Sequence, residues 1–247
     1  MILAAAQFVP VPGDIEANVR SMAALIHTAA ADGARLVVFG ELTVTGYELG
    51  LLGEDPGLWV APDDPRLAAV RDACRATATA AVVSCAARTD RARPAIASLV
   101  IGPDGELLTR YDKQHLHGPE NDIFSAGGED GRFTLDGVRF ALAICYDNRF
   151  PELAERARAD GCQVYLASSA LDRENDSFDT VYPVRARTHG LYVALGNLVG
   201  LSTGAGECCG GSAVWGPDGV VLATAGTEAP GLAVVELPLV RSAPGPC

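Results

Sequence analysis

The sequence predicts an α/β (α+β) protein in which two mixed β-sheets pack face to face, with helices on the outside. Short apolar strands alternate with amphipathic helices, which is typical of crossovers between parallel strands. Tight turns also join neighbouring strands, which indicates antiparallel hairpins within the same sheets. Two short segments recur: Ala-Asp-Gly follows a helix at 31–33 and 159–161, and Gly-Pro-Asp-Gly forms a turn at 102–105 and 216–219. This recurrence indicates an internal repeat.

The first half of the chain begins with a buried strand over 2–9, followed by a helix from Asp14 to Gly33. Asp14 suits an N-cap, and apolar residues follow at the three-to-four spacing of a helix. A second helix is predicted to begin at Asp64-Pro65, because proline is favoured at the first helical position. The other strands of this half are predicted at 36–39, 81–87, 95–101 and, after the Pro-Asp-Gly turn at 103–105, up to Tyr111.

The second half mixes strands and helices in the same way. A strand over 138–144 follows an Asp136-Gly137 turn, and Pro151 begins a helix that ends at Gly161. Another helix is predicted near 176–189, and the remaining strands at 164–166, 191–196, 212–215, 220–224 and 232–236. Because no linker or low-complexity segment divides the chain, residues 1–247 are predicted to form a single domain.

Composition and charge narrow the possible partners. A net charge of −12 without a basic tract argues against nucleic acid and anionic membranes as partners. No apolar run approaches the roughly 18 residues of a membrane span, and the apolar N-terminus lacks the positive flank of a signal peptide. The seven cysteines are odd in number and include no Cys-x-x-Cys pair, so neither a disulfide framework nor a zinc cluster is predicted. We therefore expect a cytoplasmic protein without metal or cofactor, in which only the vicinal Cys208-Cys209 pair is a redox candidate.

Three polar residues lie just beyond three apolar strands, where α/β folds place reactive groups. Glu41 follows the strand at 36–39, Lys113 lies two residues past Tyr111, and Cys145 directly follows the strand at 138–144. Lys113 is the single lysine among nineteen Lys and Arg residues, which suggests a role that needs a compact cation.

A cysteine needs a base or a positive neighbour to attack an amide. Glu41 is a candidate base, and Lys113 is a candidate for stabilising the oxyanion that develops. The turn from the strand into the helix at Pro151 is also expected to favour the thiolate form of Cys145.

Around these residues the sequence resembles the nitrilase superfamily of carbon–nitrogen hydrolases, and its amidase-like branch in particular. Gly-Glu-Leu-Thr-Val-Thr-Gly-Tyr at 40–47 resembles the segment that carries the family's general base, and Tyr-Asp-Lys-Gln-His-Leu at 111–116 resembles its lysine segment. Ile-Cys-Tyr-Asp-Asn-Arg-Phe-Pro-Glu at 144–152 resembles its nucleophile segment. The three segments occur in the family's order and spacing. Gly118-Pro119-Glu120 resembles the loop with the family's second glutamate. The resemblance spans the whole chain, although residues 186–190 depart from the Ala-x-Glu-Asn run that is frequent in the family.

The resemblance implies a four-layer αββα sandwich and a Cys-Glu-Lys triad. Glu41 would be the general base and Cys145 the nucleophile, and Lys113 with the backbone N–H of Tyr146 would hold the oxyanion. Glu120 would orient Lys113 or the substrate. The implied reaction is hydrolysis of a non-peptide C–N bond in a small amide through a cysteine thioester, which releases ammonia or an amine and a carboxylic acid. The resemblance also implies a homodimer or a larger homo-oligomer.

Residues near the triad are candidates for shaping the substrate pocket. These candidates are Tyr47, Asn148, Ser169 and Ala170. Arg149 is a further candidate, for binding a substrate carboxylate, although its proximity to Asp147 and Glu152 favours a structural ion pair.

Several alternatives remain at the level of sequence. Nitrile hydrolysis is disfavoured because nitrile-cleaving members commonly carry Trp-Glu after the cysteine, where this chain has Tyr146-Asp147. An N-carbamoyl amidohydrolase and a non-catalytic nitrilase-like binding module are further alternatives, and loss of the triad would mark the latter. Outside this family, Cys145 could pair with a histidine, and His-x-His-x-x-Glu at 115–120 could bind a metal. The candidate histidines for pairing with Cys145 are His115, His117 and His189.

Overall fold

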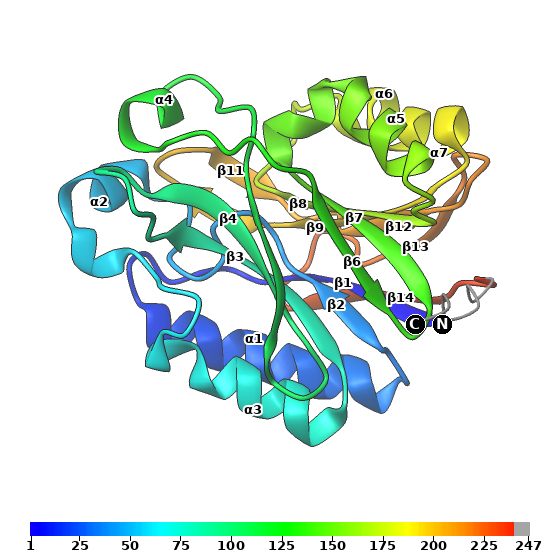
Figure 1. Cartoon of the computed structure of the whole chain (residues 1–247), viewed down its shortest axis with the longest axis horizontal. Coiled ribbons are helices and arrows are strands. Elements are labelled where there is room, and N and C mark those ends of the chain that lie inside the picture. The colour runs from blue at the N-terminus through cyan, green and yellow to red at the C-terminus, as the bar shows by residue number, and fades with distance from the viewer. Residues whose placement is uncertain (240–247) are drawn as a thin grey trace.

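Two six-stranded β-sheets lie face to face in the computed structural model of the protein, which describes residues 1–239 (Figure 1). The first sheet has the order β14-β1-β2-β3-β4-β5, with strands Gly231–Glu236, Ile2–Gln7, Leu36–Val38, Ala80–Ala87, Ala95–Ile101 and Leu107–Asp112. The second has the order β13-β12-β9-β8-β7-β6, with strands Val221–Thr224, Ala213–Trp215, Tyr192–Asn197, Val164–Ser169, Val138–Ile144 and Gly131–Leu135. A separate hairpin is formed by β10 (Val199–Ser202) and β11 (Gly206–Cys209).

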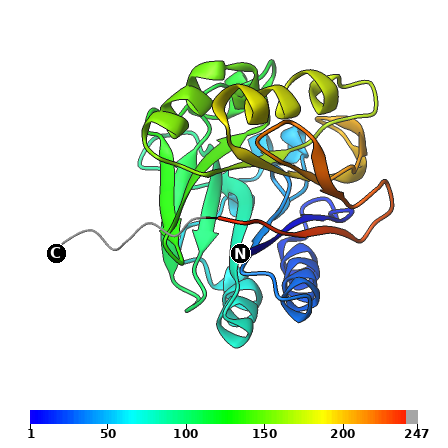
Figure 2. The ribbon, with the colours of Figure 1, turned by 90° about the vertical axis from the view of Figure 1, so that its right-hand side faces the viewer.

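Helices cover the outer face of each sheet, so that the molecule has four layers (Figures 1 and 2). Helices α1 (Ile15–Ala31) and α3 (Ala68–Thr77) pack on the first sheet, and α5 (Pro151–Ala159) and α7 (Tyr182–His189) pack on the second. Side chains along a strand point alternately to the two faces of its sheet. On β1, for example, Leu3 faces the other sheet and Ala4 faces the helices. The predicted fold of two mixed sheets flanked by helices is confirmed. Three short helices complete the described α-helices, α2 (Leu49–Glu54), α4 (Glu120–Ile123) and α6 (Ser177–Thr180).

The two sheets repeat one topology. Strands β1, β2 and β3 are parallel neighbours connected through α1 and α3, as β7, β8 and β9 are through α5 and α7. In each sheet two antiparallel strands follow, and an edge strand, β14 or β6, pairs antiparallel with the first parallel strand. The recurring Ala-Asp-Gly and Gly-Pro-Asp-Gly segments occupy equivalent places in this repeat, after α1 and α5 and between β4–β5 and β12–β13. The internal repeat that they indicated is therefore present in the fold.

Glycines allow the strand ends of the two sheets to approach closely. A Cβ on Gly40 would lie 2.9 Å from the Ser169 carbonyl oxygen, and a Cβ on Gly196 would lie 2.5 Å from the carbonyl carbon of Phe39. The next residue, Glu41, donates its backbone N–H to the Ser169 oxygen at 3.1 Å. This contact between the ends of β2 and β8 places Glu41 at the junction of the sheets, beside the end of β7.

Some elements differ from the sequence-based prediction. The single helix expected near 176–189 is divided into α6 and α7, because Pro183 fits only the first turn of a helix. Asp64 caps a 3₁₀ turn over Pro65–Leu67, and α3 begins only at Ala68. Strands β6, β10 and β11 and helices α2 and α4 were not predicted. Among residues 1–239, no helix has the length and apolar character needed to cross a membrane.

Candidate active site

Cys145 lies at the point where β7 ends and a 3₁₀ turn, η3 (Cys145–Arg149), begins. Its φ of 44° falls in the left-handed region, which non-glycine residues rarely adopt and which is concentrated at functional sites. The Asn148 side chain donates to the Cys145 carbonyl oxygen at 2.8 Å, and the Asn148 carbonyl accepts from Arg185. The strained turn is thus held from both ends, and Cys145 as a residue is partly exposed.

Asp147 connects this turn to the segment around Lys113. Its buried carboxylate accepts the backbone N–H groups of Ile144 at 3.0 Å and His115 at 2.9 Å. The same carboxylate accepts the Tyr111 hydroxyl at 2.7 Å and lies 2.9 Å from His115 Nδ1. A buried carboxylate with this many partners fixes the relative position of the segments it connects. Sequence reasoning considered Asp147 only as a possible ion-pair partner of Arg149, which pairs with Asp176 in the structure.

Lys113 directly follows β5 and is fully buried between two carboxylates. Its Nζ lies 2.7 Å from Glu41 Oε1 and 2.8 Å from each oxygen of Glu120. Burial alone would lower the pKa of Lys113, but the Glu41 and Glu120 carboxylates raise it above its ordinary value. Lys113 is therefore a permanent cation held in one place.

Glu120 is itself held by two further donors. The His117 backbone N–H donates to Oε2 at 2.7 Å, and the Tyr47 hydroxyl donates to Oε1. The structure thus brings together Glu41, Lys113, Glu120 and Tyr47 in one buried, hydrogen-bonded group.

Glu41 has one oxygen free to accept a proton. Oε1 is bound to Lys113, whereas Oε2 has no hydrogen-bond partner by geometry within the described part of the chain. Burial raises the pKa of Glu41 to about 7; Lys113 opposes this rise, Glu120 adds to it, and the nearby Cys145 thiol lowers it slightly. A carboxyl with this pKa can both take up and release a proton near neutral pH.

The Cys145 thiol has a raised pKa, so the expectation of a favoured thiolate is wrong. Burial raises this pKa most and the Glu41 carboxylate adds to the rise, whereas Lys113 and the Ala170 backbone N–H lower it less. Desolvation therefore outweighs the dipole of a short 3₁₀ turn. The resting nucleophile is a thiol, and its proton must leave during attack.

A cavity of about 360 Å³ opens at Cys145. Tyr47, Ala170 and the backbone-donor candidate Tyr146 lie on its wall. Asn148 and Ser169 are not among the residues that line it: Asn148 holds the Cys145 carbonyl, and Ser169 Oγ lies 2.8 Å from the Tyr182 hydroxyl. His117, which sequence reasoning considered only as a partner of Cys145 or a metal ligand, also lies on this wall. Sequence reasoning missed the following residues of the wall: Leu171, Asp172, Asn175, Ser177, Gly204 and Ala205.

His115, His117 and Arg149 have partners of their own, whereas the buried Nε2 of His189 has no hydrogen-bond partner among the described residues. The His115 ring stacks on Phe150 with centroids 3.6 Å apart, and the His117 ring packs against Tyr146 at 4.9 Å. Arg149, which also lines the cavity, forms an exposed ion pair with Asp176 at 2.6 Å. In the described part of the chain, no group of three or more His, Cys, Asp or Glu side chains is arranged to hold a metal ion. These contacts favour Glu41 over His115 or His117 as the partner of Cys145, and His189 is not among the residues that line the cavity.

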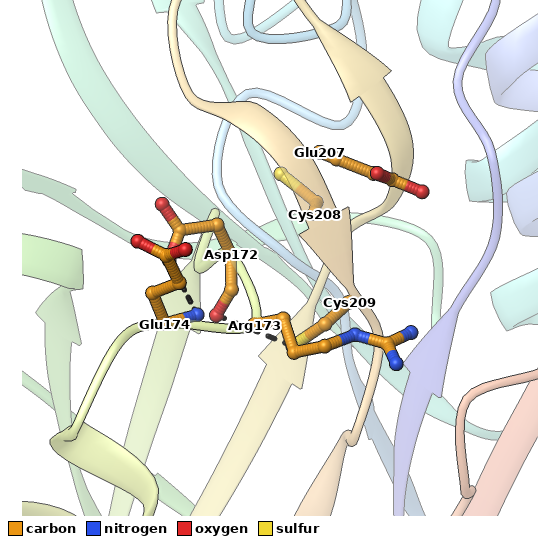
Figure 3. A pocket seen from close by; sticks show the side chains of 6 residues that line it. All are labelled: Asp172, Arg173, Glu174, Glu207, Cys208 and Cys209. Carbon is orange, nitrogen blue, oxygen red and sulfur yellow. Dashed lines mark hydrogen bonds between the residues drawn. The ribbon is translucent and has the colours of Figure 1, made fainter.

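A second hollow of about 360 Å³ shares Asp172 with the first. Figure 3 shows the side chains that line this second hollow. Its wall includes Cys208 and Cys209, which are neighbours on β11 and remain free thiols. The Cys209 thiol donates to the Asp172 carbonyl at 3.4 Å. Burial raises the pKa of Cys208 to about 12 and also raises that of Cys209, so both are poor nucleophiles. This environment does not support a redox role for the pair.

Comparisons with known proteins agree with this geometry. The family model for carbon–nitrogen hydrolases matches residues 2–245, and the chain belongs to this family. It is 32% identical over 234 residues to the hydrolase in the pqqF 5′ region of Pseudomonas protegens, covering 92% of this chain and 80% of that protein. It is 31% identical to 2-oxoglutaramate amidase of Bacillus subtilis, covering 85% of this chain and 80% of that enzyme.

A solved amidase from Nesterenkonia sp. AN1 has the same fold. Its C145A mutant in complex with butyramide gives a TM-score of 0.88 at 30% identity, with 96% of this chain and 91% of that chain covered. Its E41Q mutant shows the result of Michael addition of acrylamide at the active site cysteine. These relatives confirm that the chain is an amidase-type carbon–nitrogen hydrolase acting on non-peptide C–N bonds.

Proposed function

We propose that Cys145, Glu41 and Lys113 hydrolyse a small amide bound in the 360 Å³ cavity. The observation that carries this proposal is the buried group at the end of the cavity. There Lys113 lies 2.7 Å from one oxygen of Glu41, and the second Glu41 oxygen is free. The Cys145 thiol is close enough to Glu41 to lower the pKa of the Glu41 carboxyl.

Attack begins with proton transfer. The free oxygen of Glu41 takes the thiol proton as the Cys145 sulfur bonds to the amide carbon, and the C=O electron pair moves to the oxygen. Lys113 and the backbone N–H of Tyr146 stabilise this oxyanion. One preorganised donor of this kind contributes roughly 3–4 kcal/mol in the transition state.

Glu41 then returns the proton to the nitrogen of the tetrahedral intermediate, and ammonia or an amine leaves as the C–N bond breaks. The product is a thioester on Cys145. A water molecule attacks the thioester while Glu41 accepts one of its protons, and collapse of the second intermediate releases the carboxylic acid and restores the thiol. A pKa of about 7 suits Glu41 to both acid and base steps.

Glu120 and Tyr47 are proposed to position Lys113 rather than to exchange protons with the substrate. Both oxygens of Glu120 bind Lys113, and the Tyr47 hydroxyl binds one of them. Ala170 is proposed to contact the substrate, because it lines the cavity and its N–H lies near the Cys145 sulfur. Asn148 and Ser169 are buried supports beneath the site in this proposal.

The substrate class is tested by ammonia release from four groups of compounds, with Cys145→Ala run beside the wild type. The groups are short aliphatic amides such as butyramide, ω-amides such as 2-oxoglutaramate, N-carbamoyl compounds and nitriles. We expect Cys145-dependent release from one of the two amide groups. Release from nitriles or N-carbamoyl compounds alone would favour those alternatives. If the folded protein releases no ammonia from any of the four groups, a non-catalytic binding module would be favoured.

The pH dependence of hydrolysis provides a second test. Because burial raises the pKa of Glu41 to about 7, this group is a carboxylate, and hence a base, only above that pH. For a neutral amide, kcat/KM is expected to rise tenfold per pH unit up to about 7 and then level off, as for a single essential base. A pH profile that remains level down to pH 5 would contradict this role of Glu41.

Association into a homodimer or a larger homo-oligomer and a cytoplasmic location remain proposals. They rest on the resemblance to the family and on the reduced cysteines, Cys208 and Cys209 among them.

A further inference from the structure

The turn between β10 and β11, residues 202–205, is bound to the segment that carries Tyr47. The Ser202 hydroxyl donates to the Tyr47 carbonyl, and the Gly204 N–H donates to the same oxygen at 3.1 Å. Thr203 donates through its hydroxyl and its N–H to the buried carboxylate of Glu48. This turn, 155 residues away in sequence, thus holds the Tyr47 carbonyl and the Glu48 side chain.

Gly204 packs directly against the Tyr47 ring. A Cβ at this position would lie 2.5 and 2.6 Å from ring carbons Cδ1 and Cε1 of Tyr47 and 2.8 Å from Leu49 Cγ. Real Cβ atoms do not approach this closely, so a side chain here would displace the ring. Gly204 is not among the residues with positive φ, so it is the space and not the backbone conformation that requires glycine.

The Tyr47 side chain is connected to the buried Lys113 through Glu120. Its hydroxyl donates to Glu120 Oε1, and both Glu120 oxygens lie 2.8 Å from Lys113 Nζ. The ring is almost fully buried and therefore cannot move aside into solvent without breaking the bond to Glu120. A shift of the ring must change the position of Glu120, and with it that of Lys113.

We propose that the β10–β11 turn is a positioning element for catalysis, in which Gly204 sets the place of Lys113 through Tyr47 and Glu120. This inference rests on the proposed role of Lys113 at the oxyanion. Because the missing Cβ of Gly204 is directed at the Tyr47 ring, the turn acts on the rate of the chemical step more than on substrate affinity. The Gly204 backbone and Ala205 also line the cavity, so the turn forms part of the site as well as its support.

The test is a double-mutant cycle with Gly204→Ala and Tyr47→Phe, using an amide that the wild type hydrolyses. Gly204→Ala is expected to reduce kcat by about 10²-fold, the effect of misplacing a catalytic group by about 1 Å, with KM changed less than about threefold. Tyr47→Phe is expected to reduce kcat similarly, since Glu120 loses one of its donors. The double variant is expected to be no slower than Tyr47→Phe, because without the hydroxyl a ring shift no longer reaches Glu120.

Two comparisons separate positioning from a general loss of structure. Gly50→Ala is the matched control, since Gly50 is an exposed residue of helix α2 and a Cβ there meets nothing within 4 Å; it is expected to retain wild-type kcat. Thr203→Val removes the hydroxyl bond to Glu48 without a clash, so it serves even where Gly204→Ala does not fold. It is expected to lower kcat several-fold, and Thr203→Ser is expected to restore it.

The outcomes distinguish this inference from the proposed function. A wild type without Cys145-dependent turnover overturns both. An active wild type in which Gly204→Ala and Thr203→Val keep normal kcat overturns the inference alone. Multiplicative effects of Gly204→Ala and Tyr47→Phe, or an effect confined to KM, also overturn it, since independent local damage would produce them.

Discussion

Replacing Cys145 by alanine is expected to abolish amide hydrolysis and to leave the fold intact. Without the thiol no thioester can form, and loss of a nucleophile reduces kcat by roughly 10⁴-fold or more. The fold is expected to persist because Asp147, not the Cys145 side chain, holds the turn through its bonds to Ile144, His115 and Tyr111. Alanine has no greater difficulty than cysteine with the φ of 44°.

Ammonia release and thermal unfolding of the two proteins measure this prediction. Cys209→Ala is the matched control, because it removes an equally small thiol that is partly exposed in the neighbouring hollow. This control is expected to keep wild-type turnover. Mass spectrometry of the wild type mixed with substrate is expected to show an acyl group on Cys145, and Cys145→Ala should show none. Turnover of Cys145→Ala within tenfold of the wild type would remove the thiol from the mechanism.

Features that depend on neighbouring residues in sequence were accessible from the sequence. Alternation and helical spacing locate most strands and helices, and the recurring Gly-Pro-Asp-Gly turns correspond to a real repeat of topology. Glu41, Lys113 and Cys145 were recognisable because each lies just beyond the end of a strand. Their meeting in space was implied by the family resemblance alone, since Glu41 and Lys113 are 72 residues apart and belong together only through the pairing of the strands.

Features that depend on burial were not accessible in this way. The sequence suggested a favoured thiolate at Cys145, but desolvation by the surrounding sheets reverses the sign of that effect. The β10–β11 turn was also missed, because its short strands are rich in glycine and carry no clear alternation. Its importance to Tyr47 arises from the absence of a side chain at Gly204, which has meaning only once the packing is known.

Lys113→Arg is expected to reduce kcat by about 10²–10³-fold, the usual effect of losing one oxyanion donor. Lys113 Nζ fills a fully buried site with three carboxylate oxygens at 2.7 to 2.8 Å. The longer, planar guanidinium has no room there unless Glu41 or Glu120 moves, although its charge is the same.

The reverse exchange at Arg110, three residues away, is the matched control for this change. Arg110 forms a partly exposed ion pair with Asp112, and such pairs contribute little to stability, so Arg110→Lys is expected to keep wild-type kcat and unfolding temperature. Both variants exchange one cation for another, so the comparison of their kcat values tests whether the site of Lys113 requires a compact cation. Near-normal turnover of Lys113→Arg would mean that the site needs only a positive charge, and the chain's use of its single lysine there would then have no catalytic explanation.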